Sequence, residues 1–188
     1  MTRAGSARLA AADEVATCTK GGRDVDRTGR PGPPLADLVA RQLLHGQAWA
    51  HLAYTWPDGT PRVVPIGFHW DGREIVLATA PDTPKLRALA DGVPVALTVD
   101  GDRYPDKVLL IRGEVRLDEV DGVVPEYAAM CRRMLGEEAG RAWVAQMAAM
   151  FPRMVSLAIR PTRVGVQDFE TRFPHFLERG MARAQHSA

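Results

Sequence analysis

The sequence has little cysteine, and this shortage excludes two classes of protein. Only Cys18 and Cys131 occur among 188 residues. A disulfide framework is therefore not expected, and a reducing compartment fits the chain better. Neither cysteine has partners at the spacing that a zinc or redox motif requires, so we predict no metal site.

Long apolar runs and an excess of one charge are also missing. No run approaches the roughly 20 apolar residues of a membrane span. Asp13 and Glu14 interrupt the alanines near the N-terminus, where a secretory signal needs a continuous apolar core. The 24 basic and 23 acidic residues give a net charge of +1, so no overall field attracts nucleic acid or an anionic membrane. We predict a cytoplasmic protein that binds neither.

The chain divides into three parts by composition. Residues 1–34 contain no aromatic side chain and are rich in glycine and proline, which is typical of a flexible leader. Apolar residues at helical spacing follow, at Leu35, Leu38, Val39 and Leu43. We expect one folded domain over 35–173 and a C-terminal tail over 174–188.

Most of the folded domain has the pattern of β-strands. Asp58-Gly59 and Asp71-Gly72 suit tight turns, because glycine accepts a positive φ and aspartate caps its own backbone. The first three strands are therefore predicted to form an antiparallel meander. The predicted strands are 48–55, 62–70, 74–79, 94–100, 107–118 and 154–160, the last of them ending at Pro161.

Two helices are predicted between the last two strands. Their stripes of methionine and aromatic residues are typical of a core or a subunit interface. The stripes comprise Val123, Tyr127, Met130 and Met134, then Trp143, Met147 and Met150. The whole order of elements predicts a mainly β, α+β fold of the barrel type, not a doubly wound sheet.

The strongest candidate for a binding site is the segment from Thr79 to Lys85, where a strand ends and a short helical segment over 84–90 begins. The hydroxyl groups of Thr79 and Thr83, the ammonium of Lys85 and the N–H groups at the helix start would converge, as a bound phosphate requires. The same residues also fit a plainer interpretation. Thr83 is an ordinary helix N-cap before Pro84, and Lys85 an ordinary solvated side chain.

Five segments, in this order and with these gaps, resemble the pyridoxamine 5′-phosphate oxidase-like superfamily of flavin and deazaflavin oxidoreductases. They are Ala50–Ala53, Asp58–Pro65, Leu77–Ala80, Thr83–Leu89 and Val95–Leu97. The resemblance extends from about Gly46 to Pro161. It implies a six-stranded antiparallel split β-barrel with flanking helices, which forms a homodimer with two equivalent FMN sites at the subunit interface.

The resemblance also implies roles for individual residues. Those along the isoalloxazine ring, chiefly through their backbone, would be Arg62, Val63, Val64 and Pro65. Those that hold the phosphate would be Thr79, Ala80, Thr83 and Lys85. Lys107, which opens the fifth strand, matches a flavin-binding position and could come from the other subunit. The alternative interpretation is that Val63 and Val64 are ordinary strand residues and that Lys107 is an ordinary residue at a strand end.

The activity that the resemblance implies is an FMN-dependent oxidoreductase, which transfers hydride to or from an unidentified small molecule. The cofactor performs that chemistry, and the sequence assigns no catalytic residue. Pro84 stands where the pyridoxamine phosphate oxidases have arginine, and their basic C-terminal segment has no counterpart after Arg160. Both departures argue against oxidation of vitamin B6.

Three alternatives to this activity stay open. The first is an F420-dependent reductase. The second is a non-catalytic protein that binds flavin or haem, and the third is FAD or haem as the cofactor. Haem would need an axial ligand from among His45, His51, His69 and His175.

Overall fold

The computed structural model describes residues 33–101, 107–170 and 175–186. Residues 1–32 of the predicted leader, and Cys18 with them, lie outside these ranges.

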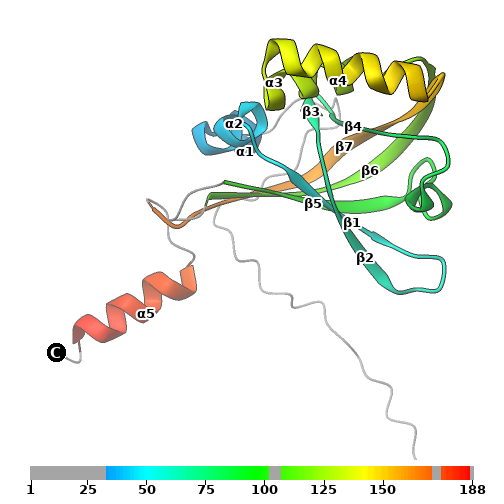
Figure 1. Ribbon diagram of the computed structural model, residues 1–188. Coiled ribbons are helices and arrows are strands. Elements are labelled where there is room, and N and C mark those ends of the chain that lie inside the picture. The colour runs from blue at the N-terminus through cyan, green and yellow to red at the C-terminus, as the bar shows by residue number, and fades with distance from the viewer. Residues whose placement is uncertain (1–32, 102–106, 171–174, 187–188) are drawn as a thin grey trace, which may run out of the picture.

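Seven strands form a single antiparallel sheet in the order β2-β1-β5-β6-β7-β4-β3 (Figure 1). The strands are β1 Ala50–Thr55, β2 Pro61–Ile66, β3 His69–Trp70, β4 Ile75–Thr79, β5 Pro94–Asp100, β6 Lys107–Asp121 and β7 Arg153–Asp168. The helices are α1 Pro33–Ala36, α2 Leu38–His45, the 3-10 helix η1 Pro84–Arg87, α3 Pro125–Leu135, α4 Glu137–Met150 and α5 His175–His186.

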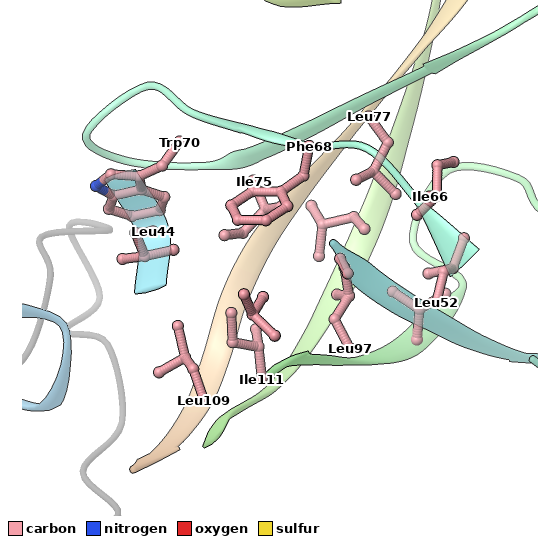
Figure 2. Packing of buried hydrophobic residues seen from close by; sticks show 14 of the residues in the cluster. Leu44, Leu52, Ile66, Phe68, Trp70, Ile75, Leu77, Leu97, Leu109 and Ile111 are labelled. Carbon is pink, nitrogen blue, oxygen red and sulfur yellow. The ribbon is translucent and has the colours of Figure 1, made fainter. Parts of the chain in front are cut away.

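The sheet curls around one hydrophobic core. Buried side chains from all seven strands and from α2 belong to the same cluster, part of which Figure 2 shows. Leu44 of α2 belongs to this cluster and lies close to Trp70 of β3 in Figure 2. The predicted mainly β split-barrel fold with flanking helices is confirmed, with seven strands in place of six.

The extra strand arises at Gly67 and Phe68, and it overturns the predicted three-strand meander. The sequence predicts one continuous strand over 62–70, but the chain leaves the sheet at these two residues, and Phe68 is buried in the core. As a result β2 pairs only with β1 at one edge of the sheet, while β3 pairs with β4 at the opposite edge. Periodicity alone cannot detect this break, because Phe68 is as apolar as a strand residue.

The last strand is longer than predicted, because Pro161 does not end it. β7 continues through Pro161 to Asp168, and its register against β6 shifts between Arg112 and Gly113. Pro161 lies opposite Gly113 at this irregularity, where a residue without an N–H group is tolerated. A Cβ atom on Gly113 would lie 2.5 Å from the carbonyl oxygen of Arg160, so the close approach of the strands requires glycine.

The predicted helical stripes differ in what they bury. On α3, Met130 and Cys131 are buried, so the core interpretation is confirmed there. On α4 only Gly140 is buried, whereas Trp143 and Met150 are 42% and 56% exposed. α5 lies within the predicted tail and stands apart from the barrel in Figure 1. None of the helices in the described ranges is long and apolar enough to cross a membrane.

Arg133 of α3 holds three parts of the fold together. Its Nη1 donates to the carbonyl oxygen of Leu44 on α2 over 2.7 Å, and its Nη2 donates to that of Phe68 over 2.5 Å. The guanidinium also lies 4.9 Å from the centre of the Phe68 ring. Burial lowers the pKa of Arg133. This side chain therefore fixes the segment that crosses from β2 to β3.

Candidate functional site

The segment from Thr79 to Lys85 forms a compact chain of side-chain hydrogen bonds between β4 and η1. Lys85 Nζ donates to Thr79 Oγ1 over 2.8 Å, and the Oγ1 atoms of Thr79 and Thr83 are 2.9 Å apart. The Thr83 hydroxyl donates to the carbonyl oxygen of Ala80 over 3.1 Å. The direction is thus fixed: the Thr79 hydroxyl donates to Thr83, and the ammonium of Lys85 heads the chain. We call Thr79, Ala80, Thr83 and Lys85 the Lys85 cluster.

The electrostatics of the Lys85 cluster favour an anion. Thr79 is only 7% exposed, and burial lowers the pKa of Lys85. No carboxylate within the described ranges forms an ion pair with Lys85. A partly buried ammonium without a counter-ion is costly, and a phosphate would relieve that cost through charge-assisted hydrogen bonds.

The predicted contribution of backbone N–H groups is weaker than expected. Thr83 N donates to Ala80 O and Leu86 N donates to Thr83 O, so both are used inside the loop. Pro84 has no N–H group to offer. The hydroxyl hydrogens of Thr79 and Thr83 are also used inside the loop, so among these side chains the ammonium of Lys85 carries the anion-binding capacity.

An arginine pair joins η1 to the β1–β2 hairpin. The guanidinium of Arg62 on β2 lies 5.6 Å from the centre of the Trp56 ring, and that of Arg87 on η1 lies 5.5 Å from it. Neither arginine forms an ion pair with a carboxylate in the part of the chain that the structure describes. The two cations extend the positive charge of the Lys85 cluster toward β2.

A groove of about 700 Å³ crosses the outer face of the sheet, and Arg62 of the arginine pair is part of its lining. Arg62 and Val63 of β2 line it, together with Ala53 of β1, Ala96 of β5 and Arg112 of β6. Its lining also includes Gly113 and Thr162, at the irregularity between β6 and β7. Most of the lining is apolar, with charge at the two sides, as suits a flat ring system.

The pairing of β1 with β2 shows which of the predicted ring-binding residues face outward. Leu52 lies opposite Val64, and both point toward the core. The alternating positions on β2, Val63 and Pro65, are exposed on the outer face. Val63 lines the groove, and Val64 can contribute only its backbone there.

Lys107 lies far from the Lys85 cluster. It pairs with Asp168 at one end of the β6–β7 ladder. Thr79 of β4 pairs with Val155 of β7, and Val155 pairs in turn with Glu119 of β6. Glu119 therefore marks the position on β6 that is level with Thr79. The twelve residues from Lys107 to Glu119 span about 40 Å at the rise of a β-strand. Lys107 Nζ lies 2.8 Å from Glu170 Oε2. Within one subunit, the structure does not bring Lys107 to the groove.

Three features of the site escaped the sequence: Trp56, Arg87 and a His51–Asp100 pair. His51 Nδ1 on β1 lies 3.3 Å from Asp100 Oδ2 on β5. These contacts depend on strand pairing between residues far apart in the chain, which spacing does not reveal. In the described part of the chain, no group of His, Cys, Asp and Glu is arranged to hold a metal ion.

Comparisons with known proteins show the family to which the chain belongs. The family model described as pyridoxamine 5′-phosphate oxidase matches residues 39–168. A solved structure of an F420 reductase is 25% identical, with a TM-score of 0.52, and covers 72% of this chain and 98% of its own. A conserved hypothetical protein from Mycobacterium tuberculosis is 20% identical, with a TM-score of 0.54, and covers 77% and 89%. No curated protein sequence matches the chain.

Proposed function

Because the chain belongs to the pyridoxamine 5′-phosphate oxidase family, we propose that it is an oxidoreductase whose flavin or deazaflavin cofactor is held by its phosphate at the Lys85 cluster. The observation that carries this proposal is the unpaired, partly buried ammonium of Lys85, hydrogen-bonded to Thr79. The ammonium hydrogens that Thr79 does not accept can be donated to phosphate oxygens as charge-assisted hydrogen bonds. The residues present therefore fit such a cofactor.

The groove that crosses the outer face of the sheet at Arg62 and Val63 supports the placement of the ring. The pair of Arg62 and Arg87 on Trp56 links η1 to the groove. Beyond the groove's edge at Val63, β2 continues for about 7 Å to Pro65, whose exposed side lies on the same outer face. When bound, the cofactor supplies hydride transfer. Val63, Val64 and Pro65 would orient it and exclude water.

FMN and F420 both fit this site, since each combines a ring that transfers hydride with a phosphate on its ribityl chain. FMN agrees with the family that the chain belongs to, and F420 with the F420 reductase that is 25% identical. Pro84 stands in the phosphate segment where the vitamin B6 enzymes have arginine. The proposed substrate is therefore a small molecule other than pyridoxamine phosphate.

We further propose that the outer face of β2, β1 and β5 is the interface of a homodimer, with the cofactor between the subunits. Val63, on the edge strand β2, is 63% exposed, and it lies opposite Ala53, which in turn pairs with Ala96. A row of apolar residues on an exposed face is typical of a protein interface. A second copy could also bring Lys107 to the groove, which one subunit does not.

The test is the absorption spectrum of the purified full-length protein, followed by calorimetric titration with FMN and with F420. We expect tight binding of one of them, reduction of the bound cofactor by a chemical reductant, and reoxidation by an organic acceptor. Binding of neither to the folded protein would overturn the proposal. Binding without any reoxidation would show a carrier, and a haem spectrum would show another cofactor.

A further inference from the structure

Two arginines on neighbouring strands lie directly opposite each other on the outer face of the sheet. Arg112 of β6 pairs with Arg163 of β7, and both residues are exposed. Because Ile111, next to Arg112, is buried in the core, the side chain of Arg112 is on the outer face, where the groove lies. Like charges at directly opposite positions of two strands repel each other and destabilise the sheet.

The other arginines of β6 and β7 all have carboxylate partners. Their ion pairs are Arg116 with Glu74 and Asp118, Arg153 with Glu119 and Asp121, and Arg160 with Glu114. Within the described ranges, neither Arg112 nor Arg163 forms an ion pair. The two guanidinium groups are therefore a local positive charge that an anion would neutralise.

The irregularity between β6 and β7 lies at this arginine pair. Arg112 pairs with Arg163, but the next residue on β6, Gly113, pairs with Pro161, so Thr162 is an extra residue of β7. The Thr162 hydroxyl donates to the carbonyl oxygen of Arg112 over 3.2 Å. Bulges of this kind are over-represented beside active sites, where they change the direction of a side chain. Here the bulge ties the backbone of Arg112 to β7 at the side of the groove.

The charge of Arg112 belongs to the groove, because Arg112, Gly113 and Thr162 are all part of its lining. Among the described residues that line the groove, Glu114 is the only carboxylate. Arg160 Nη2 lies 3.1 Å from Glu114 Oε2 and neutralises it. At this side the groove is therefore positively charged.

A row of directly paired residues links Arg112 to the opposite side of the groove. Arg112 pairs with Ala96 of β5, Ala96 with Ala53 of β1, and Ala53 with Val63 of β2. The two alanines form a small apolar floor between the arginine and the valine, which are about 14 Å apart at the spacing of neighbouring strands. An apolar molecule on this floor can reach Arg112 with an anionic group.

We infer that the Arg112–Arg163 pair binds a carboxylate of the substrate, and that the apolar part of the substrate lies against Ala96. This inference rests on the proposed function, because only a bound cofactor makes the ligand a substrate. Arginine suits a carboxylate because its planar guanidinium donates two parallel hydrogen bonds. The site leaves the Arg62 and Val63 side of the groove to the cofactor, and the substrate class is an apolar carboxylic acid in its ionised form.

The test uses 2-naphthoate as the probe and the uncharged 2-naphthamide as its match in size and shape. Both are titrated into the full-length protein, with and without cofactor, by calorimetry. In wild type we expect naphthoate to bind about tenfold more tightly than the amide, as one charge-assisted hydrogen bond provides. Arg112→Gln and Arg163→Gln should each lose most of this preference. Glu114→Gln, which removes the carboxylate from the lining, should increase it.

Matched controls separate a binding site from a general effect of charge. Arg153→Gln removes an exposed arginine at the other end of β7, outside the lining, and should keep the full preference. Light scattering should give Arg112→Gln the same mass as wild type. A smaller mass would mean that Arg112 pairs with the partner subunit, and it would overturn the inference. Equal affinities of wild type for acid and amide, or an unchanged preference in Arg112→Gln, would overturn it as well.

Failure of the inference and failure of the proposed function give different results. If the protein binds FMN or F420 but shows no preference for naphthoate, the inference is overturned and the proposed function stands. If the protein prefers naphthoate but binds neither cofactor, the proposed function fails, and the role of the anion as a substrate fails with it.

Discussion

The ammonium of Lys85 donates to the hydroxyl of Thr79 over 2.8 Å, across a loop of only five residues. The bond joins the last residue of β4 to the second residue of η1. It holds the lysine in place before any ligand arrives. Less side-chain entropy is therefore lost when an anion binds.

The first prediction concerns this ammonium. Lys85→Ala should weaken FMN binding by about 1–3 kcal/mol, the range for a charge-assisted hydrogen bond, and should leave the unfolding midpoint nearly unchanged. Arg41→Ala on α2 removes an equal charge from an exposed position and serves as the control. Equal affinities for Lys85→Ala and wild type in a calorimetric titration would refute the assignment.

The second prediction uses the pH dependence of the same group. Burial lowers the pKa of the Lys85 ammonium below its ordinary value. Since only the ammonium attracts phosphate, the affinity ratio of FMN to riboflavin should fall as the pH rises from about 7 to about 10. Lys85→Arg should keep a constant ratio, because its guanidinium stays charged. If the FMN to riboflavin affinity ratio changes equally with pH in wild type and in Lys85→Arg, the protonation of Lys85 does not control phosphate binding.

The third prediction tests the proposed dimer. Val63→Glu places a charge among the apolar residues of the outer face and should convert the dimer to a monomer, since an unpaired charge at an interface is costly. Light scattering after gel filtration measures the mass. Leu38→Glu, at a position that is 70% exposed on α2, should leave the mass unchanged. A dimeric Val63→Glu protein would exclude this face as the interface.

The fourth prediction concerns Arg133. Arg133→Met keeps the bulk of the side chain but leaves the carbonyl groups of Leu44 and Phe68 without their donor. The free energy of unfolding should fall by about 1–3 kcal/mol in denaturant titrations. The neighbouring Arg132→Met, at an exposed position, should change it by less than about 0.5 kcal/mol. Equal effects would mean that the hydrogen bonds of Arg133 contribute little.

The fifth prediction compares two glycines. A Cβ atom on Gly113 would meet the backbone of Arg160 at 2.5 Å, whereas one on Gly67 would meet the flexible end of the Met130 side chain at 2.8 Å. Gly113→Ala should therefore destabilise by about 1–3 kcal/mol, the usual cost of overpacking. Gly67→Ala should lower the free energy of unfolding by less, because the Met130 side chain can move. Combining Gly67→Ala with Met130→Ala should remove the steric contact. The opposite order in thermal unfolding would contradict the prediction.

The elements that the sequence predicts well are those set by local pattern. The strand over 94–100 is found with the predicted bounds, and the alternation over 107–118 appears as β6. Thr79, Thr83 and Lys85 also come together as predicted, because seven consecutive residues contain them all.

The wrong predictions depend on partners that are distant in the chain. β7 continues through Pro161 because the register of β6 shifts opposite it. The chain leaves the sheet at Phe68 because the Phe68 side chain is buried in the hydrophobic core. His51 meets Asp100, and Arg87 meets Trp56, only after the strands have paired. The spacing of residues within one segment cannot predict these contacts between distant segments.

The sheet order has a consequence for how the protein folds. Ile75 of β4 pairs with Ile159 of β7, and β3 has no other neighbour than β4. On the ribosome, the β3–β4 hairpin must therefore wait for almost the whole domain to be synthesised before it finds its place. Such distant pairing slows folding and leaves strand edges unprotected in the meantime. The barrel closes late, and the Lys85 cluster at the end of β4 takes its place in the sheet only then.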